Sequence, residues 1–510
     1  MKKNNIVVVG GGTAGWVTAL FAEKYYKDHN VILVESSEIG ILGAGEGSTP
    51  FLIDFFTLLG IDTMQIMKNT KGTFKNGIVF DNWNGDGKRY AHMFEPTGEM
   101  SKFALDGIFS SGCRSYFYNK LIAKGINFDD YVFNQKLTYL NKAPCSISNN
   151  VANPEIFFSI HFDARLLADY LRSVGVARGI KTYDDKLERI NTDEEGYISS
   201  INFESGLNLE TAFVYDCTGL KREIIGKFYN SKWKDYSEHL PCDSAIPFFP
   251  PMEDEIPPYT LSKAMKYGWM WKIPLQHRFG AGYVFDSKQV SEDNAKKELD
   301  DLMGYEVQSP RTFKFNPGSF KEVWIKNCMA VGLAAGFIEP LEATSIWAAA
   351  AQLDHSLRHF VLTKDRNSLD FFRKRFNQTI ENSNDRVLDF IYLHYITKRK
   401  DTKFWRDFRK INKPTPGILA ILNEIENGPL DIVAVEKMNE MKYHIMKWSD
   451  SSYLEICNGL GLLDKKFAKN YSENFNPIPS LDEYTIKANN IINKLLGHKE
   501  FLKVAGIYNP

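Results

Sequence analysis

The sequence lacks the features that disulfide bonding, metal binding or membrane insertion would require. Its six cysteines are widely scattered and none forms a C-x-x-C pair, which argues against a disulfide framework or a zinc site. No apolar run approaches the roughly 18 residues of a transmembrane helix. The apolar run at residues 6–9 is followed by glycines and is too short for a signal peptide. We therefore predict a cytoplasmic protein that needs no metal ion and no membrane.

An excess of either charge is also lacking. The 62 Lys and Arg residues nearly balance the 63 Asp and Glu residues, for a net charge of −1. Nothing in this balance favours a nucleic acid or a membrane surface as a partner. The length of 510 residues is enough for a large core and for more than one compact unit.

What is present begins with a βαβ unit at the N-terminus. Residues 6–9 (IVVV) read as a buried strand, and a glycine-rich turn at 10–15 follows. The pattern then predicts a helix over 16–27 and a second strand over 31–35. This order is typical of a dinucleotide-binding fold.

The turn has the chemistry that a dinucleotide needs. Its glycines let the backbone approach a pyrophosphate, and the start of the helix favours the negative charge. Glu35 ends the second strand, 20 residues after Gly15, and would accept hydrogen bonds from ribose hydroxyls. The motif by itself does not separate NAD from FAD. The residues that we expect at the pyrophosphate are Gly10, Gly12, Thr13, Ala14 and Gly15.

Two later segments favour FAD. VYDCTGL at 214–220 and NCMAVGLAAGF at 327–337 each read as a strand that ends in a turn of small residues. Here the sequence resembles the large flavoprotein class that includes aromatic hydroxylases. That class places an aspartate after the glycine of the second turn, whereas this chain has Leu333, which counts against an ordinary hydroxylase. The expected cofactor contacts in these turns are Gly219, Leu333 and Ala334.

The rest of the chain changes character near residue 344. Short alternating runs predict strands near 132–140, 198–203 and 281–285, and the apolar spacing after residue 344 is helical. We predict an α/β protein with an FAD-binding fold, mixed sheets and a mostly helical C-terminal substrate region. Residues 1–350 would form the FAD-binding module with inserted β-rich segments on the substrate side. Residues 351–510 would form the helical region packed on it.

The segment GWMWKIP contains two of the nine tryptophans. Side chains alternate along a strand, so Trp269 and Trp271 would point to one face and form an aromatic wall. This segment fits the W-x-W-x-I-P signature, and the sequence resembles flavin-dependent halogenases of the tryptophan-halogenase family. Further segments that fit the family follow in its order: GAGEGSTP (43–50), TFKNGIVFDNW (73–83), HFDARLLADYL (161–171), GLAAGFIEPLEATSI (332–346) and DTKFWRDFR (401–409).

The resemblance implies a reaction and its participants. Reduced FAD from a separate flavin reductase would react with O2 to give the C4a-hydroperoxide, and halide would attack it to release hypohalous acid. The oxidant would travel inside the protein to a lysine, where an electron-rich aromatic ring is halogenated. In the family, the tryptophan wall is thought to keep the organic substrate away from the flavin.

The family lysine corresponds to Lys75 in TFKNG, and the family glutamate corresponds to Glu342 in EPLEATS. Lys75 would polarise hypohalous acid as an ammonium group or form a haloamine as a neutral amine, and both forms stay open. Glu342 would orient the oxidant and take up the ring proton as a general base. Glu339 is the alternative acid, and Pro340 and Leu341 separate the two, so they need not face the same side.

The halide is expected at the start of the helix that follows Glu342. Unsatisfied N–H groups at a helix start attract anions, which points to Thr344 and Ser345. Many tryptophan-specific family members have glycine at the second position, so the preference among chloride, bromide and iodide stays open. Residues expected along the flavin side, the passage or the substrate pocket are Ala44, Glu46, His92, Phe94 and Ile346. His161 is expected to open a helix as structural support.

Two other functions compete with halogenation. A flavoprotein aromatic hydroxylase would share the FAD fold but consume NADPH directly, and a non-catalytic flavin-binding protein would need only the glycine turn. Neither explains why Lys75, Glu342 and the tryptophan pair occur together. The substrate would be a small aromatic compound, and free tryptophan, indoles and phenols are equally consistent with the sequence. A homo-oligomer is compatible with the resemblance.

Overall fold

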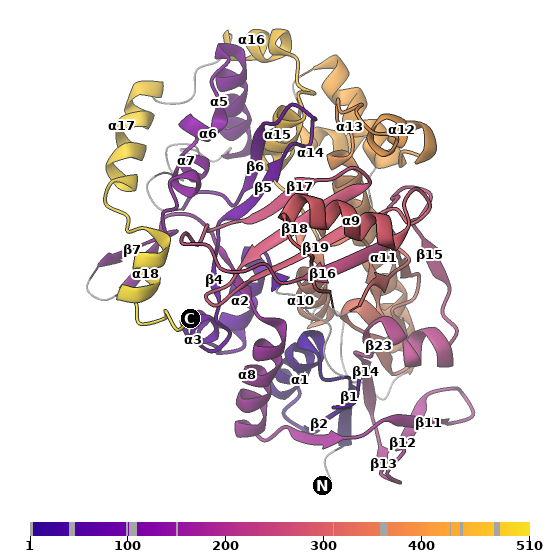
Figure 1. Ribbon diagram of the computed structural model, residues 1–510. Helices are drawn as coiled ribbons and strands as arrows, with labels where there is room; N and C mark the ends of the chain where they lie inside the picture. Colours follow the sequence, from indigo (N-terminus) through magenta and orange to yellow (C-terminus); the bar gives the residue numbers. More distant parts are fainter. Residues whose placement is uncertain are drawn as a thin grey trace.

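The computed structural model of the protein describes most of the chain. The described residues are 4–39, 46–97, 100, 110–148, 151–309, 311–357, 366–428, 430–438, 442–473 and 480–510. Figure 1 shows the N-terminal sheet at the bottom of the view and a larger sheet across the middle. The helices of the C-terminal part lie along the right, the top and the left.

A six-stranded sheet contains the predicted βαβ unit. Its strand order is β10-β2-β1-β14-β23-β22, parallel throughout except for the antiparallel edge strand β22. The apolar run IVVV is buried at its centre, as expected for a parallel sheet covered on both faces. The bounds are β1 (Asn4–Val9), β2 (His29–Glu35), β10 (Lys181–Asp184), β14 (Phe213–Asp216), β22 (Trp324–Ile325) and β23 (Cys328–Ala330).

Helix α1 (Thr13–Tyr25) connects β1 to β2 and packs on α8 (Ala164–Ala177) and α10 (Thr344–Leu357). It begins at Thr13, so the predicted start at residue 16 was wrong by three residues. The reason is that Gly12 is already its N-terminal cap, and the carbonyl of Gly12 accepts from the amide of Trp16 at 3.1 Å. The glycine turn and the first helical turn therefore overlap.

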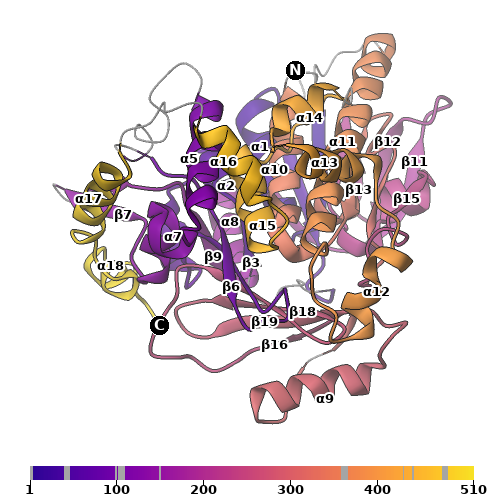
Figure 2. The ribbon, with the colours of Figure 1, turned by 90° about the horizontal axis from the view of Figure 1, so that it is seen from above.

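A seven-stranded mixed sheet lies across the middle of Figure 1, with strand order β20-β16-β19-β18-β17-β5-β6. Helix α9 (Glu292–Met303) covers one face of this sheet (Figure 2). Its residues Ala295 and Leu299 are buried in one cluster with Met270 and Tyr283. The strands are β5 (Gly77–Asp81), β6 (Arg89–Met93), β16 (Ser244–Phe248), β17 (Thr260–Ala264), β18 (Gly268–Pro274), β19 (Phe279–Phe285) and β20 (Phe313–Lys314). The strand predicted near 281–285 is confirmed as part of β19.

The smaller sheets are β3-β9-β4, β11-β12-β13, β15-β21-β24 and the pair β7-β8. The strand predicted at 198–203 is confirmed as β12. Their bounds are β3 (Glu46–Gly47), β4 (Thr73–Lys75), β7 (Cys145–Ser148), β8 (Val151–Pro154), β9 (Ser159–Phe162), β11 (Leu187–Thr192), β12 (Ile198–Phe203), β13 (Asn208–Glu210), β15 (Trp233–Asp235), β21 (Gly318–Phe320) and β24 (Gly336–Phe337).

The strand predicted near 132–140 was wrong, because this segment forms α7 (Phe133–Tyr139). Phe133 and Leu137 are both buried and lie four residues apart, which is helical rather than alternating spacing. The other helices before residue 344 are α2 (Pro50–Leu58), α3 (Thr63–Asn69), α5 (Ser110–Lys124) and α6 (Phe128–Tyr131).

All the named elements after residue 344 in the described part of the chain are helices, as predicted. The predicted boundary at residue 350 falls inside α10, and the division into two regions stays a prediction. No single helix among the described residues has the length and apolar character to cross a membrane, although α2 and α3, bent by 107°, pass this test as a pair. The remaining helices are α11 (Arg366–His394), α12 (Lys403–Ile411), α13 (Pro416–Asn427), α14 (Ile432–Met438), α15 (Asp450–Gly459), α16 (Lys465–Glu473), α17 (Leu481–Ile492) and α18 (His498–Val504).

Candidate active site

The glycine turn is built to leave one side open. Gly10 has φ +113°, and a Cβ there would lie 2.2 Å from the carbonyl oxygen of Cys217. A Cβ on Gly15 would lie 1.9 Å from the carbonyl oxygen of Gly10. A Cβ on Gly12 would meet no atom within 4 Å, so Gly12 faces open space at the start of α1. This space fits a pyrophosphate, which binds at the start of a helix because the backbone N–H groups there point towards it.

Glu35 lies at the end of β2, beside the turn. A Cβ on Gly11 would lie 1.8 Å from Glu35 Oε2, so the carboxylate rests directly against the backbone of the turn. Arg172 Nη1 lies 3.2 Å from Glu35 Oε1. Burial raises the pKa of Glu35, and the charge of Arg172 opposes that shift. The carboxylate is placed where the ribose next to such a pyrophosphate would lie.

The other two predicted cofactor turns follow neighbouring strands of the same sheet. Gly219 begins the turn η1 (Gly219–Lys221) after β14, and η3 (Gly332–Ala334) follows β23 and contains Leu333. A Cβ on Gly332 would lie 2.7 Å from the Cβ of Ala14, so the third turn touches the first. Ligands of open α/β sheets bind at the carboxyl ends of their strands, where these three turns meet. The remaining predicted contact, Ala44, lies outside the described residues.

Lys75 ends β4 and is 1% exposed. Its Nζ lies 5.7 Å from the centre of the Phe94 ring. It also lies beside β3, because a Cβ on Gly47 would be 3.5 Å from Lys75 Nζ. Burial lowers the pKa of Lys75 to about 8, although the negative charge of Glu342 acts in the opposite direction. An amine that changes charge near neutral pH is suited to handling an electrophile.

Glu342 ends the turn η4 (Pro340–Glu342) and is 4% exposed. His92 Nδ1 lies 3.0 Å from Glu342 Oε2, and His394 Nε2 lies 2.9 Å from Glu342 Oε1. Burial raises the pKa of Glu342, but the two histidines outweigh it and lower the pKa to about 2. Burial lowers the pKa of His92, and Glu342 reverses that effect and raises it. The glutamate is therefore held as a carboxylate, in electrostatic contact with Lys75.

Glu339 faces a different group of side chains. Trp269 Nε1 donates to Glu339 Oε1 at 2.5 Å, and the hydroxyl of Tyr395 donates to the same oxygen. The second oxygen, Oε2, has no hydrogen-bond partner among the described residues. Burial raises the pKa of Glu339 to about 7. The two acids of EPLE thus belong to separate clusters, and only Glu342 interacts with Lys75.

The two tryptophans of β18 form one aromatic surface. Trp269 is 1% exposed, and the ring centres of Trp269 and Trp271 lie 6.2 Å apart. Gly282 on the neighbouring strand makes room for Trp271, because a Cβ there would lie 2.1 Å from the indole ring. The predicted placement of both rings on one face of a strand is confirmed.

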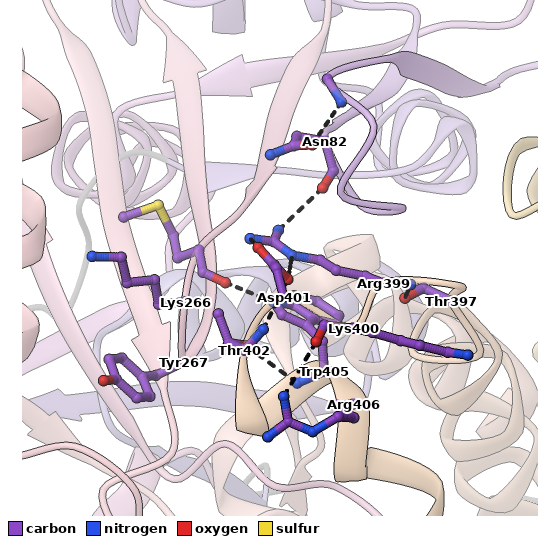
Figure 3. Close-up of polar contacts among 12 residues, drawn as sticks. Asn82, Lys266, Tyr267, Thr397, Arg399, Lys400, Asp401, Thr402, Trp405 and Arg406 are labelled. Atoms are coloured by element: carbon purple, nitrogen blue, oxygen red, sulfur yellow. Dashed lines mark hydrogen bonds and ion pairs between the residues drawn. The ribbon is translucent and has the colours of Figure 1, made fainter.

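Helix α12 supports this surface from behind, through the segment DTKFWRDFR. Trp405 Nε1 donates to the carbonyl of Met265 at 2.7 Å, in the turn between β17 and β18. Figure 3 shows Arg399 reaching both Asp401 and the backbone of Asn82, so the start of α12 is tied to the seven-stranded sheet. Helix α12 is thus bonded to the turn that leads into the tryptophan strand.

Thr344 and Ser345 are the first residues of α10, as predicted, and Ile346 follows them. Both line a small hollow between α10 and α11. Ala343, before the helix, has a positive φ of 52°, which turns the chain sharply after Glu342. The helix start thus lies directly next to the segment that carries Glu342.

Glu46 and His161 lie on the small sheet β3-β9-β4, beside Lys75. Burial and the charge of Asp163 raise the pKa of Glu46 to about 7. The prediction that His161 opens a helix was wrong: it lies in β9, and Asp163 caps α8 instead. His161 bonds through Nδ1 to Thr73 at 3.1 Å and through Nε2 to Thr260 at 2.9 Å, so it joins two sheets.

Three site residues were missed by reading the sequence. His394 and Tyr395 end or follow the long helix α11, and Glu455 in α15 accepts from the amide of Met93 at 2.9 Å. None stands in a motif with a recognisable spacing, and each reaches the site only through long-range packing. Among the described residues, no group of three or more His, Cys, Asp or Glu side chains is placed to hold a metal ion.

The fold and the site together define an FAD-binding α/β enzyme with a buried amine next to a buried carboxylate. The chain matches the family described as tryptophan halogenase over residues 5–474 and belongs to that family. It is 30% identical to tryptophan 7-halogenase RebH of Lentzea aerocolonigenes, over 91% of this chain and 90% of the relative. It is also 30% identical to tryptophan 6-halogenase ThaL of Streptomyces albogriseolus, over 93% of this chain and 91% of the relative.

A solved structure is similar over nearly the full length. Xcc4156, a flavin-dependent halogenase from Xanthomonas campestris, has a TM-score of 0.83 and 28% sequence identity, covering 99% of this chain and 98% of that one. These relationships confirm the predicted family, the predicted FAD-binding fold and the flavin-dependent halogenase class of enzyme. Nothing among them favours a hydroxylase.

Proposed function

We propose that this protein halogenates a small electron-rich aromatic compound with Lys75 and Glu342 as its catalytic residues. Halide and O2 are co-substrates, and a separate reductase delivers reduced FAD. Reduced FAD, when bound, supplies with O2 the oxidising equivalent that converts halide to hypohalous acid. The observation that carries the proposal is the burial of Lys75 beside the charge of Glu342.

The residues of the chain then guide and use the oxidant. The backbone N–H groups of Thr344 and Ser345 hold the halide at the start of α10. Lys75 Nζ binds hypohalous acid and presents its halogen to the ring. The ring carbon forms a bond to halogen, and the hydroxide that leaves the halogen takes a proton from the Lys75 ammonium group to become water. The C–H bond of the ring then breaks, and the ring proton finally replaces the one that Lys75 gave. Glu342 takes up the ring proton, which suits a carboxylate held in its charged form.

The aromatic wall separates the two halves of the reaction. Trp269 and Trp271 keep the aromatic substrate from the cofactor, while the smaller oxidant passes along the sheet that carries Glu46 and Lys75. On the substrate side, the rings of His92 and Phe390 lie 5.5 Å apart, and Phe390 stacks on Trp448 at 4.2 Å. These surroundings favour a flat aromatic substrate.

The substrate itself stays within the classes predicted from the sequence. The relatives RebH and ThaL are tryptophan halogenases, and tryptophan, indoles and phenols all fit the chemistry of the site. Cytoplasmic location and homo-oligomer formation stay predictions.

The test is a panel of aromatic substrates with chloride, bromide or iodide. An added flavin reductase supplies reduced FAD, and the products are detected by mass spectrometry. We expect one halogen to replace one ring hydrogen in at least one combination. Consumption of NADPH by the isolated protein, with hydroxylated products only, would instead establish the hydroxylase.

A further inference from the structure

His394 lies between two hydrogen-bond acceptors. Its Nδ1 lies 2.7 Å from the carbonyl oxygen of Phe390, and its Nε2 lies 2.9 Å from Glu342 Oε1. The ring is fully buried. A neutral imidazole has only one N–H group. A neutral His394 facing an ionised Glu342 would therefore leave one of these two short contacts without a proton.

The extra proton has two places to be, on His394 or on Glu342. The contacts of Glu342 decide between them. His92 Nδ1 lies 3.0 and 3.1 Å from the two oxygens of Glu342, which is the arrangement of a donor shared by a carboxylate. The charge of Lys75 also favours an anion here.

The rest of the environment of His394 is aromatic. Its ring centre lies 5.0 Å from that of Phe80 and 6.2 Å from that of Trp83. Aromatic rings attract a cation and offer it no competing proton. We propose that His394 is an imidazolium that holds Glu342 in its ionised form, as a positioning residue for the halogenation proposed above. In this role His394 acts through Glu342.

This arrangement makes the two oxygens of Glu342 unequal. Oε1 accepts from both His394 and His92, whereas Oε2 accepts from His92 alone. Oε2 is therefore the oxygen left to take the ring proton. Removing the charge of His394 would make Glu342 easier to protonate. As the pH falls, Glu342 would therefore stop acting as a base at a higher pH than in the wild type.

Other groups that titrate face the same carboxylate. They come from three further elements packed around it: Lys75 from β4, His92 and Tyr90 from β6, and Glu455 and Cys457 of α15, which interact with His92 and Tyr90. A pH profile alone would mix their contributions. The protonation state of His394 is therefore read directly.

The first experiment uses the full-length protein with histidine labelled at ring carbon Cε1. The chain has ten histidines, and the His394→Gln variant assigns the signal by its disappearance. We expect the His394 signal to lie at the imidazolium position over the pH range in which halogenation is assayed. A neutral imidazole signal in that range would overturn the proposal, and this result does not depend on halogenase activity.

The second experiment measures kcat against pH for the wild type, His394→Gln and His394→Leu. Glutamine can still donate to Glu342 but has no charge, so the acidic limb should move up by about 1–3 pH units, with kcat recovering at high pH. The His394→Leu variant, which loses both the charge and the hydrogen bond, should show this shift and also a lower kcat at every pH. If glutamine lowered kcat equally at all pH values, His394 would be structural only. Absence of activity in the wild type would refute the proposed function and leave the labelling result intact.

Discussion

The indole N–H of Trp269 donates to Glu339 Oε1 at 2.5 Å, and Glu342 follows three residues later with two histidine partners. One short segment thus carries two buried carboxylates with separate partners. Glu339 anchors the aromatic wall, and Glu342 belongs to the cluster around Lys75. The turn at Pro340 and Leu341 sends the two side chains in different directions, so the tryptophan pair and the Lys75 cluster are connected by only a few bonds of backbone.

Replacing Trp269 with Phe should weaken both the fold and the barrier. The variant loses the hydrogen bond to Glu339, which leaves a buried carboxylate with fewer donors and should lower the free energy of unfolding by about 1–3 kcal/mol. A smaller ring should also make the barrier leaky to water on the flavin side, so a larger share of the reaction of reduced flavin with O2 should end as hydrogen peroxide instead of hypohalous acid. Urea unfolding and a peroxide assay measure the two effects.

The matched control is Trp233→Phe, because Trp233 lies in β15 and stacks on Arg222, away from Glu339. It should leave the peroxide yield unchanged. If Trp269→Phe had the same peroxide yield as the wild type, the wall would be a packing feature and not a barrier.

The buried amine of Lys75 should lower the free energy of unfolding by an amount that depends on pH. Burial lowers its pKa to about 8, while an unfolded lysine keeps its ordinary value of 10.5. The unfolded state therefore binds the lysine proton more tightly than the folded state. The resulting loss in the free energy of unfolding is complete below about pH 8 and disappears as the pH rises towards 10.5.

Lys75→Met, which keeps the volume of the side chain, should accordingly be inactive but more stable than the wild type, by about 2 kcal/mol at neutral pH. The gain should shrink as the pH rises above the folded pKa. Unfolding in urea at several pH values measures this difference. A Lys75→Met variant less stable than the wild type at neutral pH would contradict the assignment of Lys75 as a buried amine whose positive charge destabilises the fold.

Gly12 and Gly15 should respond differently to the same substitution. Gly12→Ala places its methyl group in open space, so the protein should fold normally but bind FAD about 10- to 100-fold more weakly, by obstructing the pyrophosphate. Gly15→Ala would collide with the carbonyl of Gly10 and should impair folding itself. Thermal unfolding without FAD and flavin titration separate the two outcomes. Equal FAD affinity in Gly12→Ala and the wild type would place the dinucleotide elsewhere.

Local patterns predicted the parts of the site that depend on neighbouring residues. The strand–turn–helix order around Gly10, the strand with both tryptophans and the helix start at Thr344 all follow from short-range periodicity and turn chemistry. Segment 132–140 was misread because few apolar residues distinguish an alternating from a helical pattern, and burial against the C-terminal helices decided for the helix.

Long-range contacts could not be predicted in this way. Lys75 was recognised by family resemblance, since its own residue type and spacing are those of many surface lysines. His394 lies more than 300 residues further along the chain, at the end of a helix whose sequence shows only amphipathic spacing. Its meeting with Glu342 depends on how α11 packs beneath the seven-stranded sheet, which no local pattern encodes.

The most direct test of the central claim compares the wild type with Lys75→Ala under reduced FAD, O2 and bromide, with brominated product measured by mass spectrometry. Lys68→Ala is the matched control, because Lys68 is an exposed residue of α3. We expect wild type and Lys68→Ala to brominate an electron-rich aromatic at similar rates, and Lys75→Ala to bind FAD normally while losing product formation by roughly 10²- to 10⁴-fold. Bromination by Lys75→Ala at the wild-type rate would contradict the account.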